Sequence, residues 1–206
     1  MRCLLFKNRI KKQSTQKGFT LVELIVSLAI FAFMTAFLVA KYGSFNQGVL
    51  LTNLAYDVAI TIRSAQTYGL DVQGTSVGAN TLFIYPYGVH FDKGASQFIL
   101  YTDFKDSCTY GPCGYDATLS SPAEAVNTYK MRPGNTIKDI CVGSGPLACN
   151  PIGSGSFDAV FKRPSPDAIL LNNDFASTYA EITLQSSDGS IKKVILRSTG
   201  QIAVQN

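Results

Sequence analysis

The stretch Lys17-Gly18-Phe19-Thr20-Leu21-Val22-Glu23-Leu24 opens an apolar run that continues to Ala40. From Phe19 to Ala40 there are 22 residues and a single charged side chain, that of Glu23. As an α-helix the run would measure about 33 Å at ~1.5 Å per residue, which is enough to cross a hydrocarbon core of ~30 Å. The run therefore predicts a membrane-spanning helix that carries one acid near its start.

Glu23 is costly in such a helix, because an ionised side chain inside a bilayer needs a partner, and the run itself contains no basic residue. Cleavage between Gly18 and Phe19 would create one. The new α-amino group would lie one helical turn from the Glu23 carboxylate, or from that of a neighbouring copy. Opposite charges about 4 Å apart gain roughly 4 kcal/mol at an effective dielectric constant of about 20. Such a pair would offset much of the cost of burying the acid.

The segment from Lys17 to Ile25 resembles the class III signal of type IV pilins and pseudopilins, because basic leader, Gly, Phe, Glu and apolar helix occur in register. The resemblance implies that a prepilin peptidase cuts after Gly18 and that the new N-terminal Phe19 is N-methylated. It also implies that Glu23 pairs with the N-terminus of an adjacent pilin or pseudopilin subunit, in a filament built by an inner-membrane assembly platform.

Two other interpretations compete with this resemblance. An ordinary signal peptide has a shorter apolar run of ~7–15 residues, whereas this run contains an acid and lacks a small-x-small cleavage site before Lys41. A plain single-span anchor accounts for the length, but it leaves Glu23 and the Gly18-Phe19 pair unexplained.

The distribution of charged side chains also changes at Gly18, the expected cleavage position. Six of the eighteen basic side chains, and no acid, lie in residues 1–18. Without that leader, twelve basic side chains remain against fourteen acidic ones, a balance of −2. We expect a basic leader at 1–18 that is removed, a transmembrane and filament-core helix at 19–47, and a globular head at 48–206. The basic leader favours a single-pass inner or cytoplasmic membrane protein whose head is extracytoplasmic.

Five cysteines are present, of which Cys3 belongs to the leader. The other four, Cys108, Cys113, Cys141 and Cys149, form an even set in the region expected outside the cytoplasm, which favours two disulfides. Three pairings are open, and we favour the local ones, Cys108 with Cys113 and Cys141 with Cys149. Each would stabilise the head by roughly 2–3 kcal/mol in the chain-entropy model. The spacings are poor for zinc, so no metal is expected.

The remaining pattern predicts an α+β fold, with one helix packed on an antiparallel β-sheet head. An apolar stripe extends the helix, which we expect from about Phe19 to Tyr68; its residues are Leu50, Leu54, Val58, Ile62 and Ala65. Gly69 is the expected stop. Strands are expected at 82–85, 88–91, 97–102, 126–131, 136–142, 156–162, 179–184, 191–197 and 201–204. The connecting pieces 103–125, 143–155 and 163–177 are expected to be mostly loop.

Turns join expected strands into hairpins, among them Asp92-Lys93-Gly94 between 88–91 and 97–102, and Ser198-Thr199-Gly200 before 201–204. Pro86-Tyr87 is expected to link the strands at 82–85 and 88–91. Asp188-Gly189 is a strong hairpin signal between the strands at 179–184 and 191–197. In layout the chain resembles the H-type minor pseudopilins and related minor pilins, which implies a minor filament subunit of a type IV pilus or a type II secretion pseudopilus.

No pattern of catalytic residues stands out, so an enzyme is not expected, nor is a cofactor. The single histidine, His90, lies in a strand-like segment and is interpreted as satisfied locally. The acids Asp103, Asp106 and Asp116 match no calcium loop. The alternative function is a filament-tip module whose head captures DNA, a surface or a secreted substrate. The balance of −2 does not favour DNA, although Lys162-Arg163 and Lys192-Lys193 are basic pairs.

Overall fold

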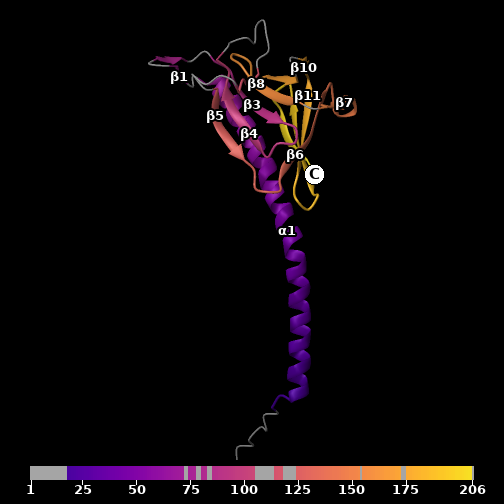
Figure 1. Ribbon diagram of the computed structural model, residues 1–206. Coiled ribbons are helices and arrows are strands. Elements are labelled where there is room, and N and C mark those ends of the chain that lie inside the picture. Colours follow the sequence, from indigo (N-terminus) through magenta and orange to yellow (C-terminus); the bar gives the residue numbers. More distant parts are fainter. Residues whose placement is uncertain are drawn as a thin grey trace, which may run out of the picture. The chain divides into compact units, whose positions relative to one another are not determined.

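Figure 1 shows the computed structural model, which describes residues 18–71, 74–77, 80–82, 85–104, 114–117, 124–153, 155–172 and 175–205. The leader before Gly18, the pair Cys108 and Cys113, and Asp106 lie outside the described residues. The chain divides into two compact units, Met1–Gly43 and Ser44–Asn206. The three-segment division at 1–18, 19–47 and 48–206 stays a prediction, since it concerns processing and anchoring.

One helix, α1 (Leu21–Leu70), contains 50 residues and confirms the expected long helix. Its N-terminal segment, Leu21–Ala40, has a mean hydropathy of 2.4 and no buried residue. The C-terminal half of α1 buries a single face in the head; these residues are Leu51, Leu54, Ala55, Val58, Ile62 and Ala65. Leu51, not Leu50, begins this stripe, because Leu51 and Val58 lie two turns apart on the same face.

Gly69 serves close packing and does not end the helix as expected. A Cβ atom added to Gly69 would lie 2.5 Å from the carbonyl oxygen of Phe161. The residue therefore lets the last turn of α1 approach strand β8 (Ser156–Phe161), and the helix continues to Leu70. The expected stop at this glycine was wrong by one residue.

The described residues of the head form three antiparallel sheets. The first has six strands in the order β10-β9-β8-β3-β4-β5, the second has five in the order β13-β12-β11-β6-β7, and the third pairs β1 with β2. The other bounds are β1 (Thr75–Val77), β2 (Asn80–Leu82), β3 (Tyr87–Asp92), β4 (Gln97–Thr102), β5 (Ala125–Lys130), β6 (Thr136–Gly143), β7 (Cys149–Pro151), β9 (Ala168–Asn172), β10 (Phe175–Ser177), β11 (Tyr179–Gln185), β12 (Ile191–Arg197) and β13 (Ile202–Gln205). A 3₁₀ helix, η2 (Pro146–Ala148), precedes β7.

The main core joins the buried side of α1 to inward side chains of both large sheets. The six-stranded sheet contributes aromatic residues, which are Tyr87, Phe91, Phe98, Phe157 and Phe161. The five-stranded sheet contributes mostly branched aliphatic residues, which are Ile137, Ile140, Ile182, Leu184, Val194 and Leu196. Because successive side chains of a strand point to opposite faces, the other face of the six-stranded sheet carries a second, smaller cluster around Tyr101 and Val160.

Three connections differ from expectation. The prediction of a hairpin at Pro86-Tyr87 was wrong. Strand β3 pairs with β4 and β8, and residues 80–82 pair with β1 instead. The piece expected as loop at 163–177 contains β9 and β10, and the one at 143–155 contains η2 and β7. These short strands are set by neighbouring strands and not by their own sequence pattern. The Asp188-Gly189 turn does join β11 to β12, as expected.

The buried helix face gives a test with a matched control. Replacing Ile62, which is 0 % exposed, by Ala should lower the free energy of unfolding by about 2–5 kcal/mol, because it leaves a cavity in the core. Replacing Ile60, which is 62 % exposed on the same helix, should cost under about 1 kcal/mol. Urea unfolding of the full chain in detergent, followed by circular dichroism, measures both. Equal losses would contradict the assigned helix face.

Candidate functional site

The first functional segment is the start of α1. Gly18, Phe19 and Thr20 are exposed and precede the helix. The Thr20 hydroxyl accepts a hydrogen bond from the backbone N–H of Glu23 at 3.2 Å, and the Thr20 carbonyl accepts one from Leu24 N–H at 3.1 Å. Thr20 is therefore the N-cap of α1. The Gly18-Phe19 bond therefore lies outside the capped helix.

Glu23 lies in the first turn of α1, where the positive end of the helix dipole favours a carboxylate. Its side chain is exposed, and it forms no ion pair with another described residue. The sequence motif predicts roles in processing and assembly for three residues. They lie within six positions at one end of the helix and are Gly18, Phe19 and Glu23. The carboxylate remains open to a partner from outside this chain.

The helix beyond Glu23 presents apolar side chains on all sides. Large side chains such as Phe31, Phe33 and Leu38 are between 68 and 76 % exposed, and none of Leu21–Ala40 is buried within the chain. An exposed apolar surface of this extent requires a lipid bilayer or apolar surfaces of other chains to cover it. The segment is therefore suited to either of these two environments.

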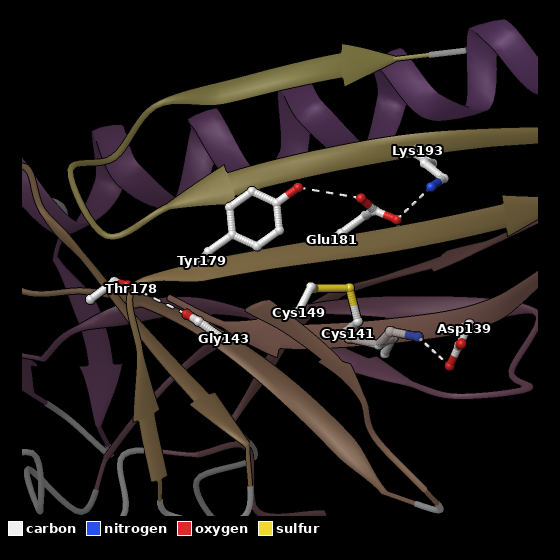
Figure 2. Close-up of a disulfide and its surroundings, with 9 residues drawn as sticks. Asp139, Cys141, Gly143, Cys149, Thr178, Tyr179, Glu181 and Lys193 are labelled. Carbon is white, nitrogen blue, oxygen red and sulfur yellow. Dashed lines mark hydrogen bonds and ion pairs between the residues drawn. A yellow bond between two sulfur atoms is a disulfide. The ribbon is translucent and has the colours of Figure 1, made fainter. Parts of the chain in front are cut away.

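The disulfide between Cys141 and Cys149 has a Cα–Cα distance of 5.4 Å and joins the end of β6 to the start of β7 (Figure 2). This is the local pairing favoured from the sequence. Cys141 pairs with Pro151 and Gly143 with Cys149 in the β6–β7 register, so the bond closes one tight strand connection. Next to it, Figure 2 shows Glu181 of β11 accepting from the Tyr179 hydroxyl and pairing with Lys193 of β12 at 2.8 Å.

A buried ionic cluster around His90, which the sequence pattern does not reveal, lies on the outer face of the six-stranded sheet. His90 of β3 is 8 % exposed, and its Nδ1 lies 2.9 Å from Oδ1 of Asp158 on β8. Its Nε2 lies 3.2 Å from Oδ1 of Asp92. The ring of Tyr115 packs on the imidazole at 4.9 Å, and the Tyr115 N–H donates to Asp158 at 3.4 Å. His90 thus connects two strands and the described segment 114–117.

This geometry favours the imidazolium form of His90. Ionised carboxylates only accept hydrogen bonds, and a ring with an N–H on both nitrogens is the protonated one. Burial by itself lowers the pKa of His90, but the hydrogen bond and charge of Asp158, with a smaller contribution from Asp92, raise it above the ordinary 6.5. His90 is therefore satisfied by ionised carboxylates. Its closest carboxylate partner, Asp158, is a neighbour in space but 68 positions away in the sequence.

Among the described residues of the head, no group of three His, Cys, Asp or Glu side chains could hold a metal ion. Asp103 and Glu124 are nevertheless buried, each about 1 % exposed. Burial raises the pKa of Glu124, although the backbone N–H of Asp116 donates to its carboxylate at 2.6 Å and partly offsets that rise.

The His90 site predicts a pH dependence with a defined sign. Because the folded-state pKa is raised, the stabilisation from protonated His90 is complete below about 6.5 and is lost as pH rises through the folded-state pKa. Ring NMR of the full chain in detergent should give a midpoint above 6.5. The signal needs no assignment, since the chain has one histidine. Asp158→Asn should lower the midpoint; a wild-type midpoint at or below 6.5 would contradict the ionic assignment.

Comparison with known proteins bears on the N-terminal segment. A family model described as the prokaryotic N-terminal methylation motif matches residues 13–39. No curated protein and no solved structure matches the chain. The matched residues include Gly18, Phe19 and Glu23 and most of the exposed apolar helix. The α+β architecture, an N-terminal helix followed by antiparallel sheets, is pilin-like.

Proposed function

The chain carries the N-terminal methylation motif of type IV pilins and pseudopilins, and from this premise we propose that it is a prepilin-type filament subunit. It is cleaved after Gly18, N-methylated on Phe19, and assembled through α1 into a type IV pilus or a type II secretion pseudopilus. The observation that carries the proposal is the coincidence of the motif with an exposed 20-residue apolar helix whose first turn holds Glu23.

Processing changes the electrostatics of the helix start. Cleavage after Gly18 removes the basic leader and leaves an α-amino cation at Phe19, just before the cap at Thr20. A methylated amine keeps its basic nitrogen and remains a cation. This cation lies near the positive end of the α1 dipole, so it is better neutralised by a carboxylate than left unpaired.

Assembly supplies that carboxylate. Glu23 of one subunit neutralises the N-terminal amine of its neighbour, and at about 4 Å the pair gains roughly 4 kcal/mol at an effective dielectric constant of about 20. The apolar side chains of Leu21–Ala40 leave lipid and pack on those of adjacent subunits. The charge pair fixes the register, since apolar packing alone is not directional.

The basic leader and the apolar helix define the expected surroundings. Six basic residues before Phe19 favour retention of the leader in the cytoplasm, which places the head across the inner or cytoplasmic membrane. The Cys141–Cys149 disulfide fits an oxidising compartment on that side. Partners are then the lipid membrane, the prepilin peptidase, the assembly platform and other pilin or pseudopilin subunits.

Within this class we propose a minor subunit similar to the H-type pseudopilins. The support is the layout of the head, in which two large antiparallel sheets follow α1 and the chain ends in the β11–β12–β13 meander. The filament-tip module that captures DNA, a surface or a secreted substrate stays a prediction from the sequence.

The processing step is tested at Gly18. A Cβ atom added there meets no atom within 4 Å, so Gly18→Val leaves the fold intact and changes only what the peptidase binds. Mass spectrometry of the membrane fraction should show wild-type chains that begin with N-methylated Phe19 and Gly18→Val chains that keep the leader. Gly48→Ala, which also meets nothing within 4 Å, is the matched control and should be processed normally. Wild-type chains that still begin at Met1 in cells with an active peptidase would refute the proposal.

The assembly step is tested at Glu23. Glu23→Gln keeps the shape but removes the charge, so cleavage and membrane insertion should persist while filament incorporation falls by at least about tenfold. A tenfold loss corresponds to only about 1.4 kcal/mol, well below the roughly 4 kcal/mol assigned to the pair. Glu23→Asp, which keeps the charge, should retain more incorporation than Glu23→Gln. Incorporation of Glu23→Gln at the wild-type level would contradict the role of the carboxylate.

A further inference from the structure

Three segments of the head meet at the place where α1 leaves it. They are residues 48–53 of α1, the β5–β6 turn with its flanks at 130–135, and the β11–β12 turn with its flank at 187–192 (Figure 1). One hollow is lined by α1 and the first turn, another by α1 and the start of β12, and Asn53 of α1 lines both. A Cβ atom added to Gly134 would lie 2.8 Å from Cβ of Ser187, so the two turns also contact each other. These three segments together form the exit surface of the head.

The exit surface combines exposed apolar side chains with basic ones. Val49 and Ile191, both branched aliphatic residues, are 44 and 41 % exposed. Lys130 and Arg132 are also exposed, and neither forms an ion pair with another described residue. Surfaces that lie on a membrane have this mixed composition, because basic groups bind the headgroup phosphates and apolar groups enter the boundary with the acyl chains.

The net charge of the exit surface is positive. Its three segments contain three basic side chains and one acid, Asp188. The carboxylate of Asp188 already accepts hydrogen bonds from the Ser186 hydroxyl and from the Ser190 N–H. A second acid, Asp57, lies farther along α1 at the rim of the first hollow. The exit surface therefore favours an anionic partner, although the balance of charge for residues 19–206 is −2.

The connection to the apolar helix brings such a partner close. The apolar segment ends at Ala40, and Gly48, the first residue of the exit surface, follows only eight residues later. Even a fully extended chain of that length spans at most about 29 Å at ~3.6 Å per residue. The headgroup layer of a bilayer extends roughly 5–8 Å beyond its hydrocarbon core. When Leu21–Ala40 spans a membrane, the exit surface is therefore held near lipid headgroups at a high effective concentration.

We propose that the exit surface binds the lipid surface beside its own anchor. Lys130 and Arg132 contact headgroup phosphates, and Val49 and Ile191 enter the boundary with the acyl chains. The contact rests on the anchoring of α1 in a membrane, which belongs to the proposed function, and it adds a second attachment that this function does not include. It holds the head on the bilayer before assembly, and a subunit that leaves the bilayer for the filament must break it.

Photo-crosslinking of the full chain in phosphatidylglycerol nanodiscs tests the contact. Loading one chain per disc keeps a second copy out of reach. A benzophenone amino acid at position 191 should give lipid adducts, detected by mass spectrometry, in at least about fivefold higher yield than the same probe at position 147. Leu147 is the control because it is 105 % exposed in η2 and belongs to the opposite end of the five-stranded sheet, where Gly143 pairs with Tyr179. Equal yields at the two positions, or no adduct at position 191, would overturn the contact.

Removal of the basic side chains gives a second readout. The double variant Lys130→Gln with Arg132→Gln should lower the adduct yield at position 191 by at least about fivefold, because it removes the attraction to phosphate. The matched control, Arg163→Gln with Arg197→Gln, removes the same charge outside the exit surface and should leave the yield unchanged. Salt at about 1 M should act like the first variant, since it shortens the screening length to ~3 Å. Equal effects of the two double variants would overturn the assigned role of Lys130 and Arg132.

A third probe position separates this contact from the proposed function. Phe31 lies in the apolar segment and is 70 % exposed, so a benzophenone amino acid there reports whether α1 is inserted in the bilayer. Lipid adducts at position 31 without adducts at position 191 refute only the contact of the exit surface. Absence of adducts at position 31 refutes the anchoring of α1, and with it both the contact and the proposed function.

Discussion

The structure depends on one constraint, which is an apolar helix that its own chain does not cover. The C-terminal half of α1 gives its apolar side to the core of the head, whereas Leu21–Ala40 has no buried residue. Lipid can cover such a surface, and so can the same surface of another chain. Under the proposed function a single acid in the first turn would distinguish the two environments, because lipid offers no charge to Glu23 and a cleaved neighbour would.

Much of the fold could be predicted because its signals are local. The helix follows from an uninterrupted apolar run and a 3.6-residue stripe, and the β11–β12 hairpin follows from alternation around Asp188-Gly189. The short strands β7, β9 and β10 escaped prediction because neighbouring strands impose them. Gly69 was misread for a related reason, since its role is set by Phe161, a residue of a distant strand.

The candidate sites also differ in whether their signals are local in the sequence. Gly18, Phe19 and Glu23 belong to one short linear motif, so the sequence identifies them without any knowledge of the fold. The His90 cluster requires β3 and β8 to be neighbours, and no pattern in the sequence announces that pairing.

The disulfide-closed turn has a consequence for how the head can change. Because η2 contains no buried residue, its sequence can be altered at little cost to the stability of the core. The disulfide keeps the backbone of the turn in place while its side chains vary. The surface at this turn can therefore vary without compensating substitutions in the sheets that carry it.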